Sequence, residues 1–381
     1  MKELNLEDII RLRRELHKNA ELSGSEKNTS EIIKNFVTKF NPDDIISGIA
    51  GYGIAFVFKG KEKGKTILFR SELDALPISE QNNFEYKSLA DNIAHKCGHD
   101  GHMAILSGLA SLLKIKKPEK GKIILLFQPA EETGEGAKAI LDDEKFETLN
   151  PDYVFALHNL PGFPIESVVI KNGIFASASK GMIVKLSGKT SHASEPENGI
   201  SPVPAVASII QKLPSLPDEM PSIKNFSLLT IIHVQIGNVA FGTTPGEGVI
   251  MATLRAFENN DLKTLTKMSE NLIKEEAKKY SLKYSIKLTE EFPSSINNGK
   301  CVEIVKKSSE KLNLNVIEID QPFRWSEDFG HFLNKYKGVL FGVGAGKEHP
   351  DLHNPDYDFP DSIINPSIKL LNSLATEILD N

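Results

Sequence analysis

Apolar and polar positions alternate along the chain with two different periods, and their order predicts an α/β fold. Apolar residues recur at helical spacing in the opening segment, at Leu6, Ile9, Ile10 and Leu16, and again in residues 32–40. Short apolar runs, typical of strands buried on both faces of a helix-covered sheet, follow these helices. The runs are Ile54–Phe58, Thr66–Arg70, Lys122–Phe127 and Tyr153–Leu157, with a buried helix expected over Met103–Leu113. We therefore expect a mostly parallel sheet flanked by helices.

The pattern changes near Ala178 and predicts an inserted unit. The expected elements are a strand over 181–186, a helix over 203–213, strands over 228–234 and 249–257, a helix over 261–279 and a strand over 282–288. This strand-helix-strand-strand-helix-strand order resembles a ferredoxin-like insertion. The α/β character then returns, with a strand near Gly338 and a closing helix over 365–379.

The length of the chain supports the same division. A chain of 381 residues is long for a single hydrophobic core, so two domains are expected. We expect a larger α/β domain over residues 1–177 and 290–381, and an inserted α+β domain over 178–289.

Composition and charge disfavour several kinds of binding partner and cellular location. Hydrophobic residues make up 40% of the chain and charged residues 25%, as in soluble globular proteins. The net charge of −6 disfavours nucleic acid, and Lys61–Lys65 is interpreted as a turn rather than a docking patch. No apolar run approaches the roughly 20 residues of a membrane span, and residues 1–8 lack the apolar core of a secretory signal. Two cysteines make no disulfide framework, although a Cys97–Cys301 bridge stays open, and we expect a cytoplasmic protein.

One thiol and three imidazoles are gathered in His95–His102, in a chain with only two cysteines and ten histidines. Cys97 and His99 can reach one metal ion from a single turn, because Gly98 lets the backbone bend. The competing interpretation is a small buried cysteine beside a hydrogen-bonded histidine. His95 and His102 stay open as further ligands, and His102 is better suited to contacting substrate or supporting the site.

Carboxylates and one more histidine follow other predicted strands. Glu72 and Asp74 follow one strand, Glu131 and Glu132 a second, and His158 a third. The carboxyl ends of strands in an open α/β sheet are where sites form. Adjacent glutamates diverge, so one can bind a metal while the other takes a proton from water, although a solvated pair is the ordinary alternative. Together these residues predict metal-dependent hydrolysis of a resistant bond such as an amide.

These segments resemble the M20 metallopeptidase family, in its branch of aminoacylases, hippurate hydrolases and auxin-conjugate hydrolases. The resemblance runs from Arg11 to about Phe359. The motifs that carry it are Arg70–Pro77, His95–His102, Phe127–Glu132, Gly188–Ala193 and Ser326–Phe329.

The resemblance implies a site with two divalent metal ions, zinc or manganese first, with cobalt or nickel as alternatives. The implied metal ligands are Cys97, which bridges both ions, His99, Glu132, His158 and His353. Glu131 is the implied general base, and Asp74 is implied to orient a ligand. The residues alone do not separate His353 from His349.

The resemblance also implies a homodimer formed through the inserted domain, which closes over the site as a lid. His192 of that domain is implied to reach the partner's site and to stabilise the oxyanion, a catalytic role. A surface histidine after a turn is the competing interpretation.

Three positions depart from the family pattern. Glu72 stands where aspartate is usual, Ala20 where proline is usual, and Gly242 where an asparagine that contacts substrate is usual. Arg255 matches a family arginine and is a candidate for binding a carboxylate. The departure at Gly242 leaves the particular substrate open.

The resulting hypothesis is a metal-dependent amidohydrolase that cleaves the amide bond of a small N-acyl amino acid or a related conjugate. Dipeptidase or other exopeptidase activity and N-acetyldiaminopimelate deacetylation use the same machinery and stay as alternatives. A non-catalytic binding protein on a metal-stabilised scaffold is the alternative from another class. The presence of Glu131 and all the implied ligands disfavours it.

Overall fold

The computed structural model describes residues 5–219 and 225–380. The contacts divide the chain into two compact units, one of Met1–Phe175, Ser295–Pro322 and Glu327–Asn381, the other of Ala176–Ser294 and Phe323–Ser326. None of the described helices is long and apolar enough to cross a bilayer. Residues 1–8 were expected to lack the apolar core of a secretory signal, and residues 1–4 of this segment lie outside the described residues.

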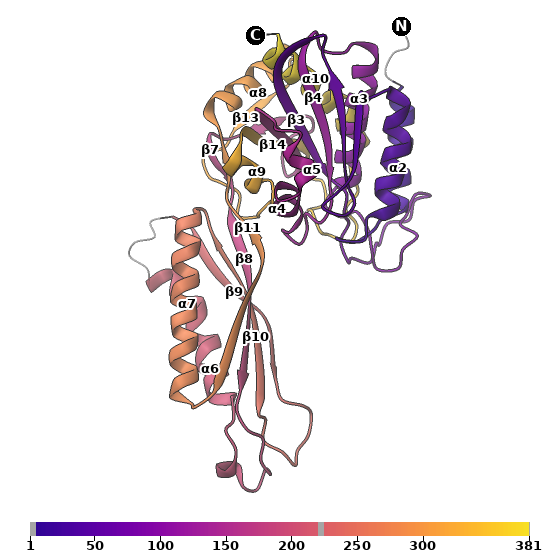
Figure 1. The fold of residues 1–381 in the computed structure, drawn as a ribbon. Coiled ribbons are helices and arrows are strands. Elements are labelled where there is room, and N and C mark those ends of the chain that lie inside the picture. Colours follow the sequence, from indigo (N-terminus) through magenta and orange to yellow (C-terminus); the bar gives the residue numbers. More distant parts are fainter. Residues whose placement is uncertain (1–4, 220–224, 381) are drawn as a thin grey trace. The chain divides into compact units, whose positions relative to one another are not determined.

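An eight-stranded sheet forms the centre of the first unit (Figure 1). From one edge to the other its strands are β1 (Asp44–Ile49), β2 (Gly53–Lys59), β4 (Lys120–Gln128), β3 (Glu62–Glu72), β5 (Tyr153–Pro161), β14 (Lys337–Gly346), β6 (Val168–Ile170) and β13 (Val316–Glu318). The central strands β4, β3, β5 and β14 run parallel to one another. The predicted mostly parallel sheet is thereby confirmed.

Helices cover both faces of this sheet. One group packs together in the main core and consists of α1 (Leu6–Lys18), α2 (Lys27–Val37), α3 (His99–Ile115), α8 (Gly299–Lys311) and α10 (Ile364–Leu379). The other consists of α4 (Gly136–Leu141), α5 (Glu144–Glu147) and α9 (Gly330–Lys335). A small two-stranded sheet pairs β7 (Gly173–Ala176) with β12 (Ser295–Asn297). Short 3₁₀ helices span Thr38–Phe40, Pro196–Asn198, Leu213–Glu219 and Asp361–Ile363.

The two-sided cover explains why these strands are continuous apolar runs. In β4, Ile123, Leu125 and Phe127 face the main core, while Ile124 and Leu126 point the other way and are also fully buried. Successive side chains of a strand alternate between its faces, so a strand covered on both sides is apolar through its middle, and in β4 the polar Gln128 comes at the end.

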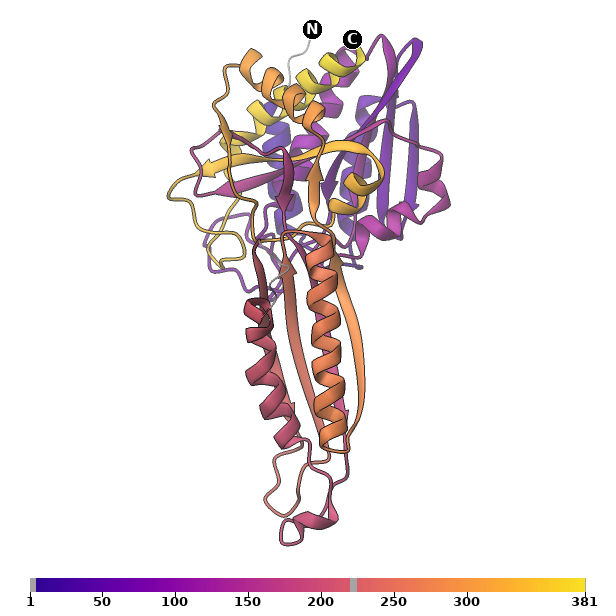
Figure 2. The ribbon, with the colours of Figure 1, turned by 90° about the vertical axis from the view of Figure 1, so that its left-hand side faces the viewer.

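The second unit is a four-stranded antiparallel sheet with two helices on one face (Figure 2). Its strand order is β11 (Lys283–Phe292), β8 (Ala178–Ser187), β10 (Glu247–Ala256) and β9 (Ser227–Ile236), and its helices are α6 (Val203–Lys212) and α7 (Asn259–Lys279). In β10, Ile250, Ala252 and Leu254 are buried while the intervening residues are not, because only one face is covered. The order and connections are those of a ferredoxin-like unit, as predicted.

The prediction that Lys61–Lys65 forms a turn is wrong. Strand β3 begins at Glu62, and its pairing with β4 shifts register between Glu62 and Thr66. The charged residues in this segment belong to an exposed strand end, where a lack of apolar residues does not prevent backbone pairing.

Two boundaries near the predicted site also differ from expectation. Helix α3 begins at His99 rather than Met103, so His99 belongs to its first turn. Strand β5 continues to Pro161, which places His158 inside the strand rather than after it. The extension follows from pairing with β14, which continues along β5 to its last residue.

Candidate metal centre

The turn from Cys97 to His99 begins the candidate site. Gly98 has a φ of +90°, a left-handed conformation that glycine adopts without strain, and α3 starts directly after it. Cys97 Sγ, a ring nitrogen of His99 and a ring nitrogen of His158 lie within 4.8 Å of one another.

The backbone carbonyl of Asp74 contacts the His99 ring. Nδ1 of His99 donates to the backbone oxygen of Asp74 at 2.9 Å. Its Nε2 therefore faces away from Asp74, at 3.8 Å from one oxygen of Glu131 and 3.8 Å from one of Glu132. Asp74 Oδ2 accepts from the Glu132 backbone N–H at 2.9 Å and from the Ser23 hydroxyl at 2.7 Å. One aspartate thus joins a histidine to the turn that carries the glutamates.

A strained turn carries the two glutamates. Ala130 has a φ of +54°, which is uncommon for a residue with a Cβ. Its N–H donates to Glu26 Oε1 at 2.8 Å, and Glu26 is a buried residue that the sequence analysis did not single out. Strain of this kind persists only where neighbouring contacts hold it, and it concentrates at functional sites.

The neighbouring glutamates have different partners. Glu131 Oε1 accepts from the backbone N–H of Asp328 at 3.4 Å. Glu132 Oε2 lies 3.9 Å from Nε2 of His353. Each glutamate therefore has one oxygen near His99 Nε2, and the two differ in the partner of the other oxygen.

His158 presents one ring nitrogen to the cysteine. Its Nδ1 donates to the backbone oxygen of Asn159 at 2.8 Å, and its Nε2 lies 3.5 Å from Cys97 Sγ. The backbone contact selects the tautomer in which Nε2 carries a lone pair that can bind a metal.

His353 is brought to the site by a backbone bond across the chain. It has a φ of +66°, and its N–H donates to the Lys96 carbonyl oxygen at 2.7 Å. His349 of the same loop instead donates from Nε2 to the Asp358 carbonyl oxygen at 2.6 Å. The structure thus separates two histidines that the residues alone did not.

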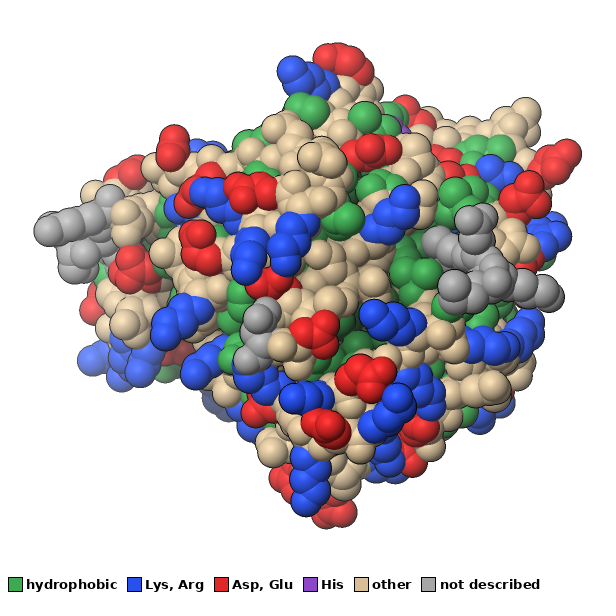
Figure 3. All heavy atoms as spheres, turned by 90° about the horizontal axis from the view of Figure 1, so that it is seen from above, with side chains coloured by type: hydrophobic (Ala, Val, Ile, Leu, Met, Phe, Trp, Pro, Cys, Tyr) green, Lys and Arg blue, Asp and Glu red, His purple; other side chains and the backbone are tan. Residues whose placement is uncertain are grey.

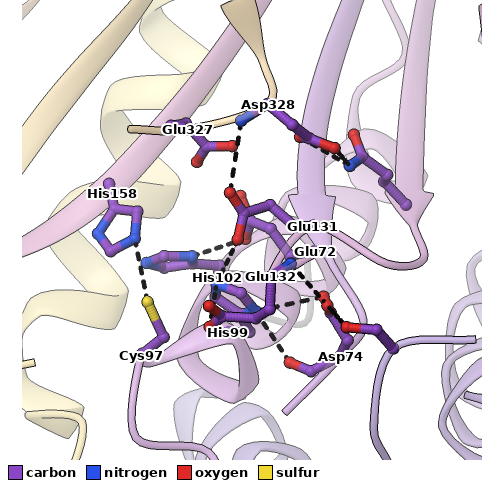
Figure 4. A network of polar contacts seen from close by, with 12 residues as sticks. Glu72, Asp74, Cys97, His99, His102, Glu131, Glu132, His158, Glu327 and Asp328 are labelled. Carbon is purple, nitrogen blue, oxygen red and sulfur yellow. Dashed lines mark hydrogen bonds and ion pairs between the residues drawn. The ribbon is translucent and has the colours of Figure 1, made fainter. Parts of the chain in front are cut away.

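The residues predicted as ligands converge, and Figure 4 shows most of them gathered in one place. Their donor atoms form overlapping groups, each within 4.8 Å: Cys97–His99–His158, Cys97–Glu132–His353 and His99–Glu131–Glu132. Cys97, His99 and Glu132 each belong to two of these groups, so the groups form one continuous cluster.

Negative charge dominates this region. The buried or nearly buried carboxylates are those of Glu72, Asp74, Glu131, Glu132, Glu327 and Asp328. Burial, with the charges of Glu327 and Glu132, raises the pKa of Glu131 well above its usual range. Burial also raises the pKa of Glu132 to about 7. These shifts reflect negative charge that the protein itself does not neutralise. Bound cations would neutralise it.

The pKa of His99 reflects the same excess of negative charge. Burial alone would lower its pKa, but the hydrogen bond to Asp74 and the charges of Glu72 and Glu132 raise it to about 10. Burial, with the charges of Glu132 and Glu131, raises the pKa of the Cys97 thiol.

Unpartnered buried atoms show that the residues fit metal ions. Among the described residues, His99 Nε2, Glu132 Oε1 and Asp74 Oδ1 are buried without a hydrogen-bond partner. An unsatisfied buried polar atom costs about 1–3 kcal/mol, so a ligand is expected there. Thiolate, imidazole and carboxylate are donors that zinc and neighbouring transition metals accept.

Arg70 has a role that the sequence analysis did not identify. Its guanidinium contacts Glu72 and Asp328, donates to Gln128 Oε1 at 2.8 Å and forms two bonds to Glu327, at 2.9 and 3.2 Å. Arg70 therefore anchors the segment whose backbone N–H contacts Glu131. The available signal was a cation directly after the apolar run Ile67–Phe69.

His102 supports the site through its own hydrogen bonds. Its Nδ1 donates to Glu72 Oε2 at 2.7 Å, and its Nε2 accepts from the Asn159 backbone N–H at 3.1 Å. Although Glu72, His99 and His102 present atoms close enough to hold an ion, both His102 nitrogens have protein partners. His95 is buried with neither ring nitrogen bonded among the described residues, and it joins none of the possible ligand groups found there.

His192 lies in the second unit, next to the loop that contains Gly242. It is exposed, its Nδ1 lies 2.6 Å from the Ser194 hydroxyl, and it forms a β-bridge with Thr243. The N–H of Ala193 donates to the Gly242 carbonyl oxygen at 3.0 Å. Two positions singled out for separate reasons are therefore neighbours in this unit.

Arg255, also in the second unit, contacts only neutral acceptors. It donates to Ser326 Oγ at 3.0 Å and to the Arg324 carbonyl oxygen at 3.3 Å. Burial lowers its pKa. No ion pair found among the described residues includes it, so its charge is available to an anionic group.

Fold and donor set together define a class, that of two-domain α/β metallohydrolases. Residues 68–377 match the peptidase family M20/M25/M40, and the chain belongs to this family. The resemblance drawn from the sequence motifs is thereby confirmed.

Named relatives cover nearly the whole chain. The N-acetyl-L-cysteine deacetylase of Bacillus subtilis (strain 168) is 30% identical over 374 residues, which are 98% of this chain and 88% of that protein. The hippurate hydrolase of Campylobacter jejuni is 29% identical over 374 residues, 98% of this chain and 97% of that protein. A crystal structure of a dinuclear metal-binding M20 peptidase from Bacillus subtilis superposes with a TM-score of 0.81 at 25% identity, covering 98% of each chain.

Proposed function

We propose that this protein is a metal-dependent amidohydrolase that cleaves the amide bond of N-acyl amino acids or related conjugates. The observation that carries the proposal is the convergence of the five predicted ligands beside Glu131. The deacetylase and hippurate hydrolase relatives support the substrate class, and the dinuclear relative supports two ions.

We assign Cys97, His99, Glu132, His158 and His353 as the residues that would hold two metal ions. Ions bound there supply Lewis acidity for the amide carbonyl and lower the pKa of water. The cysteine and histidines favour zinc, while a carboxylate in the set also suits manganese, cobalt or nickel.

Glu131 is the proposed general base. One of its oxygens accepts from the Asp328 N–H, and the other lies 3.8 Å from His99 Nε2, on the side of the ligands. It takes the proton from the attacking water and later delivers it to the leaving amine. Asp74 acts in the same proposal by orienting His99.

The substrate is proposed to be a small molecule with a carboxylate. The unpaired charge of Arg255 suits such a group. Gly242 has open space around it and presents no side chain, so a contact that asparagine makes in the family is missing or supplied elsewhere.

We further propose that residues 178–289 form a lid and dimerisation domain, and that His192 stabilises the oxyanion in the partner's site. Strand β9 supports the dimer, because it is a sheet edge that pairs only with β10 in this sheet. Leu228, Ile232, Val239 and Phe241, on this strand and the loop after it, are exposed.

A cytoplasmic location and the absence of a nucleic-acid partner complete the proposal. Both cysteines are free, which suits a reducing compartment. On the face shown in Figure 3, basic and acidic side chains are interspersed, whereas nucleic-acid binding usually needs a basic patch.

The test is metal analysis combined with a substrate panel. Purified protein is analysed by mass spectrometry for bound metal and assayed for amine release from N-acetyl and N-benzoyl amino acids, with and without a chelator. We expect two ions per chain and turnover that the chelator abolishes and added metal restores.

Other outcomes contradict the proposal in distinct ways. Turnover of dipeptides alone would replace it with a peptidase, and turnover of N-acetyldiaminopimelate alone would narrow it to that deacetylase. Bound metal without turnover of any panel member would favour the non-catalytic alternative.

A further inference from the structure

Every polar group of Asn159 forms a hydrogen bond with a residue of the candidate site or next to it. Its backbone N–H donates to His102 Nε2 at 3.1 Å, and its carbonyl accepts from His158 Nδ1 at 2.8 Å. Its side-chain Nδ2 donates to the Cys97 carbonyl oxygen at 2.8 Å, and Oδ1 accepts from the Tyr357 hydroxyl at 2.5 Å. Asn159 is fully buried, so none of these bonds competes with bulk water.

The orientation of the Asn159 carboxamide follows from its partners. The Cys97 carbonyl can only accept a hydrogen bond, so the atom facing it is the nitrogen. The second N–H of that nitrogen faces His102 Nε2 at 3.1 Å. His102 donates from its other nitrogen to Glu72, which leaves Nε2 as an acceptor. The two groups that face Nδ2 therefore require an amide nitrogen and would oppose a carboxylate oxygen there, whereas the Tyr357 hydroxyl can donate to either.

The carboxamide also packs against the turn between two proposed ligands. A Cβ at Gly98 would lie 2.4 Å from Asn159 Nδ2 and 2.7 Å from the Tyr357 hydroxyl. The left-handed conformation of Gly98, which sets the separation of Cys97 and His99, is thus held from the outside by these two side chains.

Tyr357 extends the connection to the distant loop of His353. The Tyr357 carbonyl accepts from Lys96 Nζ at 2.7 Å, while the Lys96 carbonyl accepts from the His353 N–H at 2.7 Å. Both Lys96 and Tyr357 are fully buried. Segments at residues 96–99, 158–159 and 353–357 therefore meet at one carboxamide and one hydroxyl.

We infer that Asn159, assisted by Tyr357, is a positioning residue that holds the ligand-bearing segments in the geometry required by two divalent ions. This inference rests on the proposed function. A ligand set already in place loses less conformational freedom on binding metal, and groups that orient ligands typically contribute 10–100-fold to metal affinity.

The decisive variant is Asn159→Asp, which keeps the shape and replaces two donors by acceptors. The holoenzyme is titrated with a chromophoric chelator to obtain the dissociation constant for Zn²⁺. We expect binding to weaken about 10–100-fold, and a Co²⁺-loaded sample to show a shifted thiolate-to-cobalt absorption band, because the Cys97 turn moves. Tyr357→Phe removes a single hydrogen bond and should weaken binding about fivefold.

Asn297→Asp is the matched control. Asn297 is also a buried asparagine, donates to the Lys171 and Leu340 carbonyl oxygens at 3.0 and 2.8 Å, and accepts from the Leu340 N–H at 2.8 Å. It lies outside the proposed ligand set, so its variant should lower the melting temperature without changing metal affinity or the cobalt spectrum.

The outcomes separate this inference from the proposed function. If wild type binds two ions and Asn159→Asp binds them equally tightly with an unchanged spectrum, Asn159 is merely structural and the inference is wrong. If Asn159→Asp does not fold, an unchanged affinity in Tyr357→Phe overturns it instead. A wild-type protein that binds no metal overturns the proposed function, and the inference with it.

Discussion

Glu131 and Glu132 show how single residues in one turn come to have different chemistry. They are adjacent in the chain, yet one contacts a backbone N–H from residue 328 and the other faces a histidine from residue 353. Ala130, which precedes them, has a left-handed conformation, and its N–H donates to Glu26. Burial beside other carboxylates raises the pKa of Glu131, a shift that bound cations would oppose.

Replacing Glu131 by glutamine should remove catalysis and keep the site intact. The amide has nearly the same shape but cannot take a proton, so kcat is expected to fall about 10²–10⁴-fold. The bound metal content should stay at the wild-type level, as measured by mass spectrometry. Glu135→Gln, in the same loop but exposed, serves as the control and should have wild-type kcat. Full activity in Glu131→Gln would exclude this residue as the base.

Element packing beneath the metal centre depends on buried ion pairs between α1 and α3. His17 of α1 donates to Asp100 of α3 at 2.8 Å and contacts Glu80 at 2.9 Å. Arg13, one turn earlier in α1, donates to Asp358 and Asp361 at 2.9 Å each. Burial alone would lower the pKa of His17, but its hydrogen bonds to Asp100 and Glu80 raise it to about 9.

This pairing predicts a loss of stability in mild alkali. The pKa of His17 is higher in the folded than in the unfolded chain, so its contribution is complete below about pH 6.5. It should be lost as pH rises through about 9, and the shift corresponds to about 3 kcal/mol. Urea unfolding at pH 6 and pH 9.5, at equal metal loading, should show this decline in wild type and a smaller one in His17→Gln. Equal declines in both proteins would show that His17 is not the titrating group.

At the scale of the whole molecule, the chain combines two units of different character. The first is a sheet covered on both faces, and the second is a sheet covered on one face with an unpaired edge strand, β9. Exposed apolar side chains and a sheet edge are features that association with a second copy would cover. The proposal that His192 acts across a dimer makes a quantitative prediction at this scale.

Mixing two inactive variants should restore activity. Glu131→Gln lacks the base and His192→Ala lacks the oxyanion group, so each protein alone should be nearly inactive. After subunit exchange at equal concentration, half of the dimers contain both chains and one of their two sites is complete. The mixture should therefore reach about a quarter of the wild-type kcat.

Light scattering before mixing establishes the oligomeric state, and each variant mixed with itself is the control. Recovery near zero with confirmed exchange would place His192 in its own chain's site, and full activity of His192→Ala alone would place it outside any site. A monomer in solution would overturn the proposed dimer.

The sequence by itself determined the element types and the chemical class. Two-sided burial makes β4 an apolar run, and one-sided burial makes β10 alternate, so such strands could be predicted from local periodicity, whereas β1, β6 and β13 of the large sheet were not. Cys97, His99, Glu131 and Glu132 were candidates because rare functional groups lie within a few residues of one another. Strand ends were less predictable, since pairing with β14 carries β5 past His158.

Only the tertiary structure decided which distant residues share a site. His353 was separated from His349 by a backbone bond to Lys96, and Arg70 and Asn159 acquired their roles through partners up to 258 residues away in the chain. Hydrogen bonds and ion pairs act over a few ångströms. Local periodicity does not show which distant segments folding brings that close together. The class of chemistry can therefore be predicted from the sequence, whereas the arrangement of the residues in the candidate site depends on long-range packing.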